Sequence, residues 1–141
     1  IQVGSVRRVI CAAPSYLEKY GVPATPAELK HHRIVVSQSA WASPEWRFAE
    51  GQRVLVDPVL QSNTNESAIA TARAGWGLTR VLSYQAGPSL QEGALQIVLD
   101  AFEEPPLPIH VVYPEGRQAP AKVRAFVDLA VARLRGNPLF N

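Results

Sequence analysis

The segment from Ser62 to Leu82 constrains the fold more than any other part of the sequence. It reads S-N-T-N-E-S-A-I-A-T-A-R-A-G-W-G-L-T-R-V-L. Asn65 is predicted to cap a helix, because its side-chain oxygen can accept from the free N–H groups of the first turn. Glu66 suits the positive end of the helix dipole, and Gly75 suits the left-handed position that ends a helix. The segment therefore predicts a polar loop, a capped helix, a tight turn and a buried strand over 78–82.

Composition favours a packed globular chain. The 141 residues are 47% hydrophobic and 18% charged, which suits one domain or two small lobes. The net charge of +2 and the absence of a basic strip give no reason to expect nucleic-acid binding by these residues. The sequence begins at Ile1 and contains no methionine, so we expect it to be part of a longer polypeptide.

Strand and helix patterns alternate along the chain, which predicts the α/β class. Strands are expected at 6–12, 33–38, 78–82, 94–99 and 107–113, and further helices at 14–20, 26–31 and 120–135. Thr25 and Glu28 have the spacing of a capping box for the helix at 26–31. Runs 45–49 and 53–61 flank a turn and predict an antiparallel hairpin, with Trp46 and Phe48 in the core. Trp41 precedes the hairpin in a loop, where it covers either core or a ligand.

The C-terminal helix has an apolar stripe that needs a covering surface. The stripe consists of Val123, Phe126, Val127, Ala130, Val131 and Leu134. The three prolines within 103–108 predict a linker, and only one strand follows that linker before the helix. The first strand, further chain or a partner must complete the cover. We expect this stripe to pack on a second copy, so a homo-oligomer is predicted.

No catalytic or metal-binding constellation is apparent in the sequence. Cys11 lies in an apolar strand and is predicted to be an inert core thiol. His31 and His32 are adjacent, so on a helix they point in different directions and do not share a metal. Glu103 and Glu104 fall in the predicted linker and are expected to be solvated. The sequence therefore predicts no enzyme, no cofactor and no metal.

Polar residues gather where predicted elements begin or end. Open α/β sheets bind ligands at strand ends and at helix N-termini, so these residues predict a small-molecule site. Each group alone also fits an ordinary solvated loop or helix cap. The candidate ligand-binding residues are Ser37, Gln38 and Ser39, then Asn63, Thr64, Asn65 and Glu66, and finally Thr79 and Arg80.

The sequence resembles the effector-binding domain of LysR-type transcriptional regulators. The matching stretches are V-R-R-V-I-C-A-A-P-S-Y-L-E-K-Y-G-V-P-A-T-P-A-E-L-K-H-H at 6–32, A-R-A-G-W-G-L-T-R-V-L-S-Y-Q at 72–85, P-L-P-I-H-V-V-Y-P-E-G-R at 106–117 and K-V-R-A-F-V-D at 122–128. Ala13 stands where the family usually has serine, and Leu82 where many members have proline.

The resemblance implies a periplasmic-binding-protein-like fold of type 2, with an effector bound between two lobes. Residues 1–8 would be a crossing strand from the first lobe and 9–103 the second lobe. Residues 104–141 would be a linker, a returning strand and the C-terminal helix of the first lobe. The family's second-lobe ligand contacts would fall on the strand-end and helix-start residues named above.

The function implied is ligand sensing in a cytoplasmic, DNA-binding transcriptional regulator that acts without a cofactor. DNA would be bound by a region outside this sequence. The polar helix start favours an anionic effector such as a carboxylate-bearing metabolite. One lobe of a periplasmic solute-binding protein for transport is the alternative.

Overall fold

The computed structural model describes residues 1–38, 43–113 and 119–140. It divides into two compact units, one formed by Ile1–Val6 with Pro106–Asn141 and the other by Arg7–Pro105. The sequence predicts boundaries after residues 8 and 103 and assigns the parts to two lobes of a larger fold. That assignment to lobes stays a prediction. Ser39 and Trp41 lie outside the described residues.

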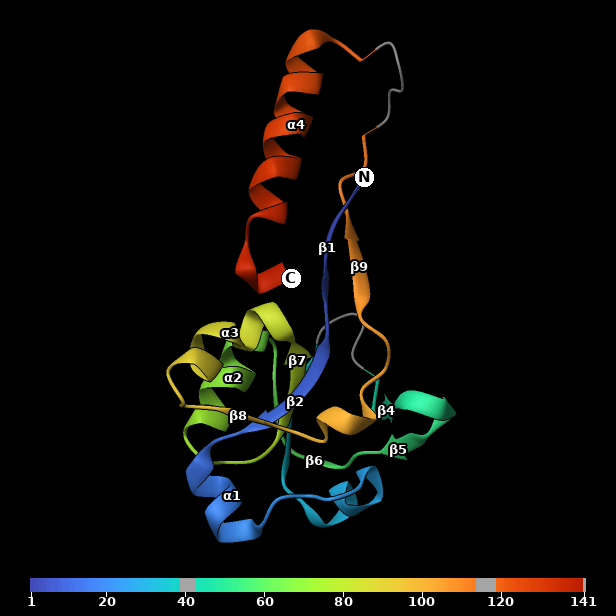
Figure 1. Ribbon diagram of the computed structural model, residues 1–141. Coiled ribbons are helices and arrows are strands. Elements are labelled where there is room, and N and C mark those ends of the chain that lie inside the picture. The colour runs from blue at the N-terminus through green and yellow to red at the C-terminus, as the bar shows by residue number, and fades with distance from the viewer. Residues whose placement is uncertain (39–42, 114–118, 141) are drawn as a thin grey trace. The chain divides into compact units, whose positions relative to one another are not determined.

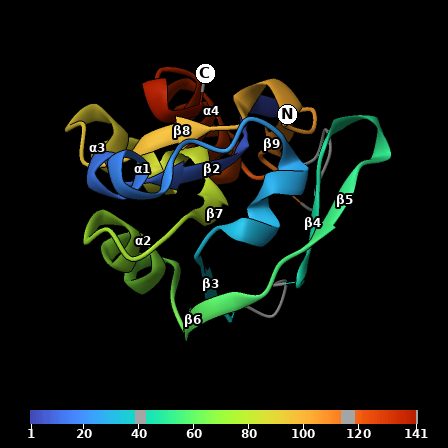
Figure 2. The same cartoon turned by 90° about the horizontal axis from the view of Figure 1, so that it is seen from below.

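Unit Arg7–Pro105 contains a three-stranded sheet whose centre is β2 and a two-stranded sheet beside it. The first sheet consists of β7 (Thr79–Leu82), β2 (Arg8–Ala12) and β8 (Gln96–Val98), and the second of β3 (Ile34–Ser37) and β6 (Pro58–Ser62). Strand β2 pairs antiparallel with β7 on one side and with β8 on the other. Strands β3 and β6 pair in parallel and lie side by side in Figure 2. An isolated parallel bridge between Ile34 and Leu78 joins β3 to the chain just before β7.

The alternating side chains of β2 divide the core of this unit into two clusters. Val9 and Cys11 belong to a cluster with Ala72 of helix α2 (Asn65–Arg73) and Ala86 of helix α3 (Ser83–Gln91). These two helices lie next to each other in Figure 1. Ile10 and Ala12 belong to the second cluster, which also contains Tyr16 of helix α1 (Pro14–Tyr20). Small alanines on α2 and α3 let those helices approach the sheet closely.

The hairpin predicted over 45–61 is shorter than expected. Strands β4 (Glu45–Arg47) and β5 (Arg53–Leu55) pair antiparallel, and Trp46 and Phe48 are buried as predicted. Glu50 and Gly51 both have positive φ, as a tight hairpin turn of the primed type requires. The prediction that 53–61 forms one strand is wrong, because the chain leaves the hairpin after Leu55 and continues as β6 beside β3.

Three local predictions differ from the structure by small shifts. Strand 6–12 is broken at Arg7 into β1 (Gln2–Val6) and β2. The cap of α2 is Thr64, and Asn65 is the first helical residue. Thr25 makes no side-chain cap, because the segment Pro26–His31 is a 3-10 helix and Glu28 accepts from Ala24 N at 2.7 Å instead.

The start of β3 is held by a buried tyrosine. The Tyr16 hydroxyl accepts the Arg33 N–H at 3.0 Å and lies 2.8 Å from Nδ1 of His32. Because the hydroxyl proton is then free to donate, neutral His32 with an unprotonated Nδ1 can accept it. Burial lowers the pKa of His32 below its ordinary value, with Glu28 opposing the shift and His31 adding to it.

We expect the stability of the Arg7–Pro105 unit to fall as the pH drops below about 6.5. Folded His32 has a lowered pKa, so the unfolded chain binds more protons in this window and is favoured as the pH falls. Urea unfolding between neutral pH and about pH 5 measures the slope. His32→Asn keeps an acceptor for Tyr16 and should flatten the dependence of stability on pH. His31→Asn, at an exposed position, should leave that dependence unchanged. Equal slopes in both variants would refute the role of His32.

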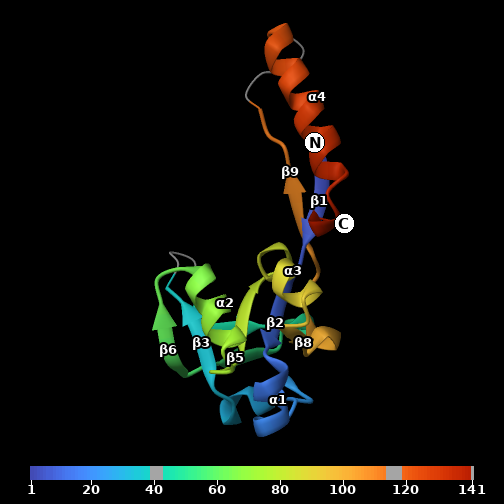
Figure 3. The ribbon, with the colours of Figure 1, turned by 90° about the vertical axis from the view of Figure 1, so that its left-hand side faces the viewer.

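Unit Ile1–Val6 with Pro106–Asn141 is a two-stranded antiparallel sheet beside one helix. Strand β1 pairs with β9 (Leu107–His110), and helix α4 (Ala121–Arg135) contacts β1 (Figure 3). Of the predicted stripe only Val127 is fully buried, and Phe126 remains 70% exposed. The first strand therefore covers part of the stripe, and packing on a second copy stays a prediction.

Within the described ranges, no helix has the length and apolar character needed to cross a membrane.

Candidate functional site

Polar residues that end β3 and β6 meet the start of α2, and we call this group the β3–α2 cluster. It consists of Ser37, Gln38, Gln61, Ser62 and Asn65. The Ser37 hydroxyl donates to Oδ1 of Asn65, across a separation of 28 positions in the chain. The Gln38 N–H donates to the Ser62 carbonyl at 2.6 Å, and the Gln38 amide donates to Oε1 of Gln61. The structure therefore brings together two of the groups that the sequence singled out.

The first turn of α2 offers further donors. Thr64 Oγ1 accepts from Ser67 N at 3.1 Å, so the cap satisfies one of the first-turn N–H groups. The N–H groups of Asn65 and Glu66 are left without an intrahelical partner, as at every helix start. Because Oδ1 of Asn65 accepts from Ser37, its amide N–H groups are directed away from that bond. Asn63 and Glu66 are exposed beside this turn.

The chemistry of the β3–α2 cluster suits a polar or anionic small molecule. Its available groups are mainly donors: first-turn N–H groups and the Asn65 amide. The helix dipole adds a partial positive charge at the same place. The cluster is thus a surface that can hold carboxylate or hydroxyl oxygens.

Thr79 and Arg80 lie on opposite faces of β7. Thr79 pairs with Cys11 in the antiparallel register and is 1% exposed, so it belongs to the face covered by α2 and α3. Arg80 pairs with Ile10 and lies on the other face. Among the described residues, no hydrogen bond joins either of them to the β3–α2 cluster.

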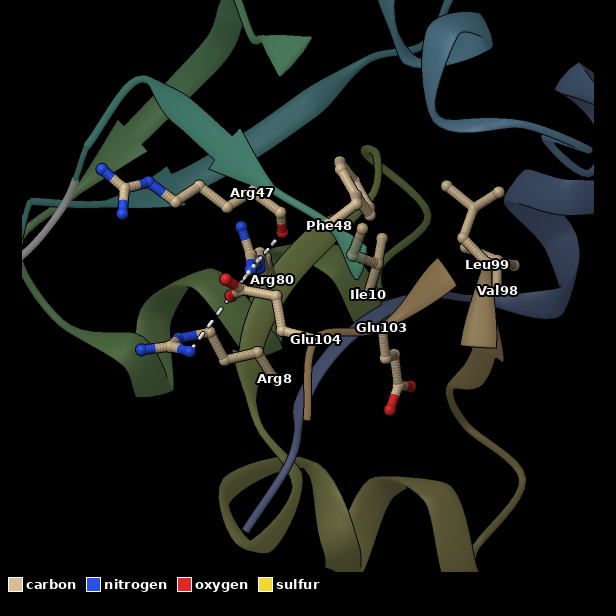
Figure 4. Close-up of a pocket in the computed structure, with 9 residues that line it drawn as sticks. All are labelled: Arg8, Ile10, Arg47, Phe48, Arg80, Val98, Leu99, Glu103 and Glu104. Carbon is tan, nitrogen blue, oxygen red and sulfur yellow. Dashed lines mark hydrogen bonds and ion pairs between the residues drawn. The ribbon is translucent and has the colours of Figure 1, made fainter. Parts of the chain in front are cut away.

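Arg80 belongs to a separate group that we call the Arg80 cluster, formed by Arg8, Arg47, Arg80, Glu103 and Glu104 (Figure 4). Glu104 Oε2 lies 3.1 Å from Nη1 of Arg8 and 3.4 Å from Nη2 of Arg80. The same Arg80 nitrogen donates to the Arg47 carbonyl at 2.8 Å. Burial lowers the pKa of Arg80 from its ordinary value, and Glu104 opposes that shift.

The sequence-based expectation that Glu103 and Glu104 are solvated is wrong. The Glu103 side chain is only 11% exposed and pairs with Arg7 at 3.2 Å. Its Oε1 atom is buried with no hydrogen-bond partner in the part of the chain that the structure describes. Burial raises the pKa of Glu103, and Arg7 opposes the shift. The sequence contains two adjacent arginines at 7–8 and two adjacent glutamates at 103–104. No local pattern predicts that residues so far apart in the chain form ion pairs.

The free space of the Arg80 cluster is small. The enclosed cavity is about 10 Å³, which is at the lower limit for one water molecule. Beside it lies an open groove of about 270 Å³, which the turn at Glu50 and Gly51 lines together with Pro105. Arg47, Phe48 and Glu104 line both spaces, so the groove adjoins the cluster.

Cys11 is buried, and desolvation raises the pKa of its thiol to about 12, which removes the thiolate that nucleophilic chemistry needs. Within the described ranges, no three His, Cys, Asp or Glu side chains gather as a metal site would require.

Known proteins similar to this chain are regulators. The family described as LysR substrate binding domain matches residues 1–135. An HTH-type transcriptional regulator of Haemophilus influenzae is 31% identical, over 86% of this chain and 43% of its own length. A second, of Xanthomonas campestris pv. campestris, is 32% identical, over 94% of this chain and 41% of its own length. The chain thus spans about two fifths of these relatives.

Solved structures share the fold. The regulatory domain of AphB from Vibrio vulnificus superposes with a TM-score of 0.81 at 22% identity, covering 94% of this chain and 67% of AphB's domain. CrgA, a LysR-type transcriptional regulator from Neisseria meningitidis, gives a TM-score of 0.79 at 23% identity, covering 96% of this chain and 47% of CrgA. The predicted fold class, periplasmic-binding-protein-like of type 2, is confirmed by this likeness.

The resemblance noted in the sequence is thereby confirmed, and the transport alternative is not favoured, since the reported relatives are transcriptional regulators. The chain belongs to the LysR substrate-binding domain family.

Proposed function

We propose that this chain is the sensing domain of a LysR-type transcriptional regulator and binds a small-molecule effector at the β3–α2 cluster. The observation that carries the proposal is the hydrogen bond from Ser37 to Asn65, which joins the end of β3 to the start of α2. The exposed residues Gln38, Asn63, Thr64 and Glu66 would complete the rim. Ser39 is proposed as a further member from its position in the sequence alone. Thr79 and Arg80 are weaker members of the proposal: Thr79 lies on the core face of β7, and Arg80 would be a separate anchor for an anionic group.

The proposed effector carries a carboxylate. A carboxylate oxygen can accept from the first-turn N–H groups of α2 and from the Asn65 amide, where the helix dipole also favours negative charge. Such a ligand changes the activity of a regulator only through different affinities for two conformational states. The protein would then act as a switch, not as an enzyme, and would need no cofactor.

The remaining parts of the proposal follow from the relatives. Their HTH-type regulator names imply DNA binding, which a region outside these 141 residues would provide. We assign the protein to the cytoplasm, where its DNA target lies. Oligomerisation is proposed from the exposed apolar side chains of α4, Phe126 and Leu129, which are 70% and 56% exposed.

Asn65→Ala should weaken effector binding by about tenfold or more, because one hydrogen bond to a charged ligand contributes about 1.5–3 kcal/mol. The regulator that contains this domain is screened with small carboxylates by thermal shift, and affinity for the best compound is measured by calorimetry. Ser37→Ala should have a similar effect.

Thr71→Ala is the matched control. The Thr71 hydroxyl comes from the second turn of α2 and donates to the Ser67 carbonyl, so it takes none of the first-turn N–H groups. Affinity in this variant should equal that of the wild type. If Asn65→Ala binds the compound as tightly as Thr71→Ala, the effector site lies elsewhere.

A further inference from the structure

Glu104 is held by two arginines whose backbones are fixed in paired strands. Arg8 begins β2 and Arg80 lies in β7, and these strands are paired in the sheet. Both guanidinium groups reach the same oxygen, Oε2 of Glu104. Glu104 itself follows the 3-10 helix Asp100–Phe102 and belongs to no strand. The sheet therefore supplies the cationic side of this contact, and an irregular segment supplies the anion.

Arg80 has a second set of contacts that fix its orientation. It donates to the Arg47 carbonyl at 2.8 Å, and its guanidinium carbon lies 5.8 Å and 5.7 Å from the ring centres of Trp46 and Phe48. Only 13% of its side chain is exposed. These contacts would persist without Glu104, so Arg80 stays poised to receive a carboxylate.

The charges around Glu104 favour an anion. Arg8, Arg47 and Arg80 line the cavity against two glutamates, and one of these, Glu103, is already paired with Arg7. Removing the Glu104 carboxylate would leave the two guanidinium groups of Arg8 and Arg80 without their shared partner. A partly buried cation without a counter-ion is costly, so an anion from solution would be attracted.

The open groove provides a route to this position. Glu104 lines both the groove and the small cavity, so this residue lies between the two spaces. A small ligand in the groove of about 270 Å³ would meet Glu104 before it met Arg80. The enclosed cavity alone, at about 10 Å³, has no room for a ligand while Glu104 is in place.

We propose that Arg8 and Arg80 form a carboxylate-binding site which Glu104 occupies as an internal competitor. A ligand carboxylate entering by the groove would replace Glu104 and release the segment that carries it. This deepens the proposed function by adding a regulated anion subsite. The anion subsite rests on the proposed function only in the identity of its physiological ligand.

Chemical rescue of Glu104→Ala by acetate tests the site without effector or DNA. Loss of the carboxylate should lower the melting temperature of the isolated chain by roughly 5 °C, since a small domain shifts by several degrees for each lost ion pair of this kind. Acetate, raised at constant ionic strength against chloride, should restore at least half of the loss. If the variant is unfolded in chloride, recovery of its far-UV circular dichroism by acetate measures the same rescue.

Three variants serve as controls. Glu104→Gln keeps the position filled and should not respond to acetate. Glu45→Ala removes the carboxylate shared by Arg47 and Arg53, whose side chains line the open groove but are 63% and 58% exposed, so water solvates them without a counter-ion. The double variant with Arg80→Ala should lose the rescue. The proposal is overturned if acetate does not raise the melting temperature of Glu104→Ala. It is also overturned if acetate stabilises any of the three control variants as much as it stabilises Glu104→Ala.

Discussion

Gly77→Ala should lower the free energy of unfolding of the Arg7–Pro105 unit by about 1–3 kcal/mol. A Cβ atom at this position would lie 2.5 Å from the Arg33 carbonyl oxygen and 2.9 Å from its carbon, so backbone must move. The contact cannot be relieved by a side-chain rotation. Two backbone hydrogen bonds beside it, from Leu78 N to Arg33 O and from Val35 N to Leu78 O, are both 2.8 Å long. They join the start of β3 to the residue just before β7.

The effect of Gly77→Ala should extend to the β3–α2 cluster, because Ser37 is carried by β3. Hydrogen exchange at the Val35 amide should therefore accelerate along with the fall in stability measured by urea unfolding. Gly136→Ala is the control: its Cβ would lie 3.4 Å from the nearest atom, at a negative φ of −81°. Equal stability of the two variants would show that the close approach of Gly77 to Arg33 is unimportant.

Features with a local cause were predicted well from the sequence. Helix α1 has the predicted bounds, since Pro14 suits its first turn and Gly21, with φ of 86°, ends it. Gly75 takes the left-handed conformation after α2 for the same reason. In each case the preference of one residue for one backbone conformation decides the outcome, and no distant contact is needed.

Features that depend on distant pairing were missed. Residues 58–62 alternate like a hairpin strand, but β6 pairs with β3 instead, through a parallel register that no local pattern encodes. Burial of Glu104 depends on Arg8, 96 positions earlier in the chain. Within the candidate site, Ser37 and Asn65 were each chosen as polar ends of elements, whereas their mutual hydrogen bond required the fold.

Arg80→Ala should destabilise the Arg7–Pro105 unit by about 2–4 kcal/mol, because the variant breaks a largely buried ion pair and removes two cation–π contacts. The side chain is 13% exposed, so solvent screens its interactions only weakly. Glu104 keeps Arg8 as a partner, so the loss of stability is smaller than for a buried charge left with no partner. Urea unfolding measures the change.

Arg80→Lys separates charge from shape. A lysine keeps the positive charge, but one ammonium group cannot bridge the Arg47 carbonyl and Glu104 while lying against Trp46 and Phe48. We expect it to recover less than half of the stability lost in Arg80→Ala. Full recovery would mean that net charge alone matters, and the planar guanidinium would then have no special role as a carboxylate receptor.

A double-mutant cycle with Glu104→Ala isolates the pair itself. We expect a coupling energy of about 1–2 kcal/mol between Arg80 and Glu104, and a clearly smaller one between Arg53 and Glu45, an exposed pair at a similar distance of 3.2 Å. The two pairs differ in burial and in the aromatic contacts of Arg80, not in charge type. If the coupling energy of Arg80 with Glu104 is no larger than that of Arg53 with Glu45, both arginines bind their glutamates as ordinary surface groups do. In that case the surrounding rings and sheet do not strengthen the binding of a carboxylate by Arg80.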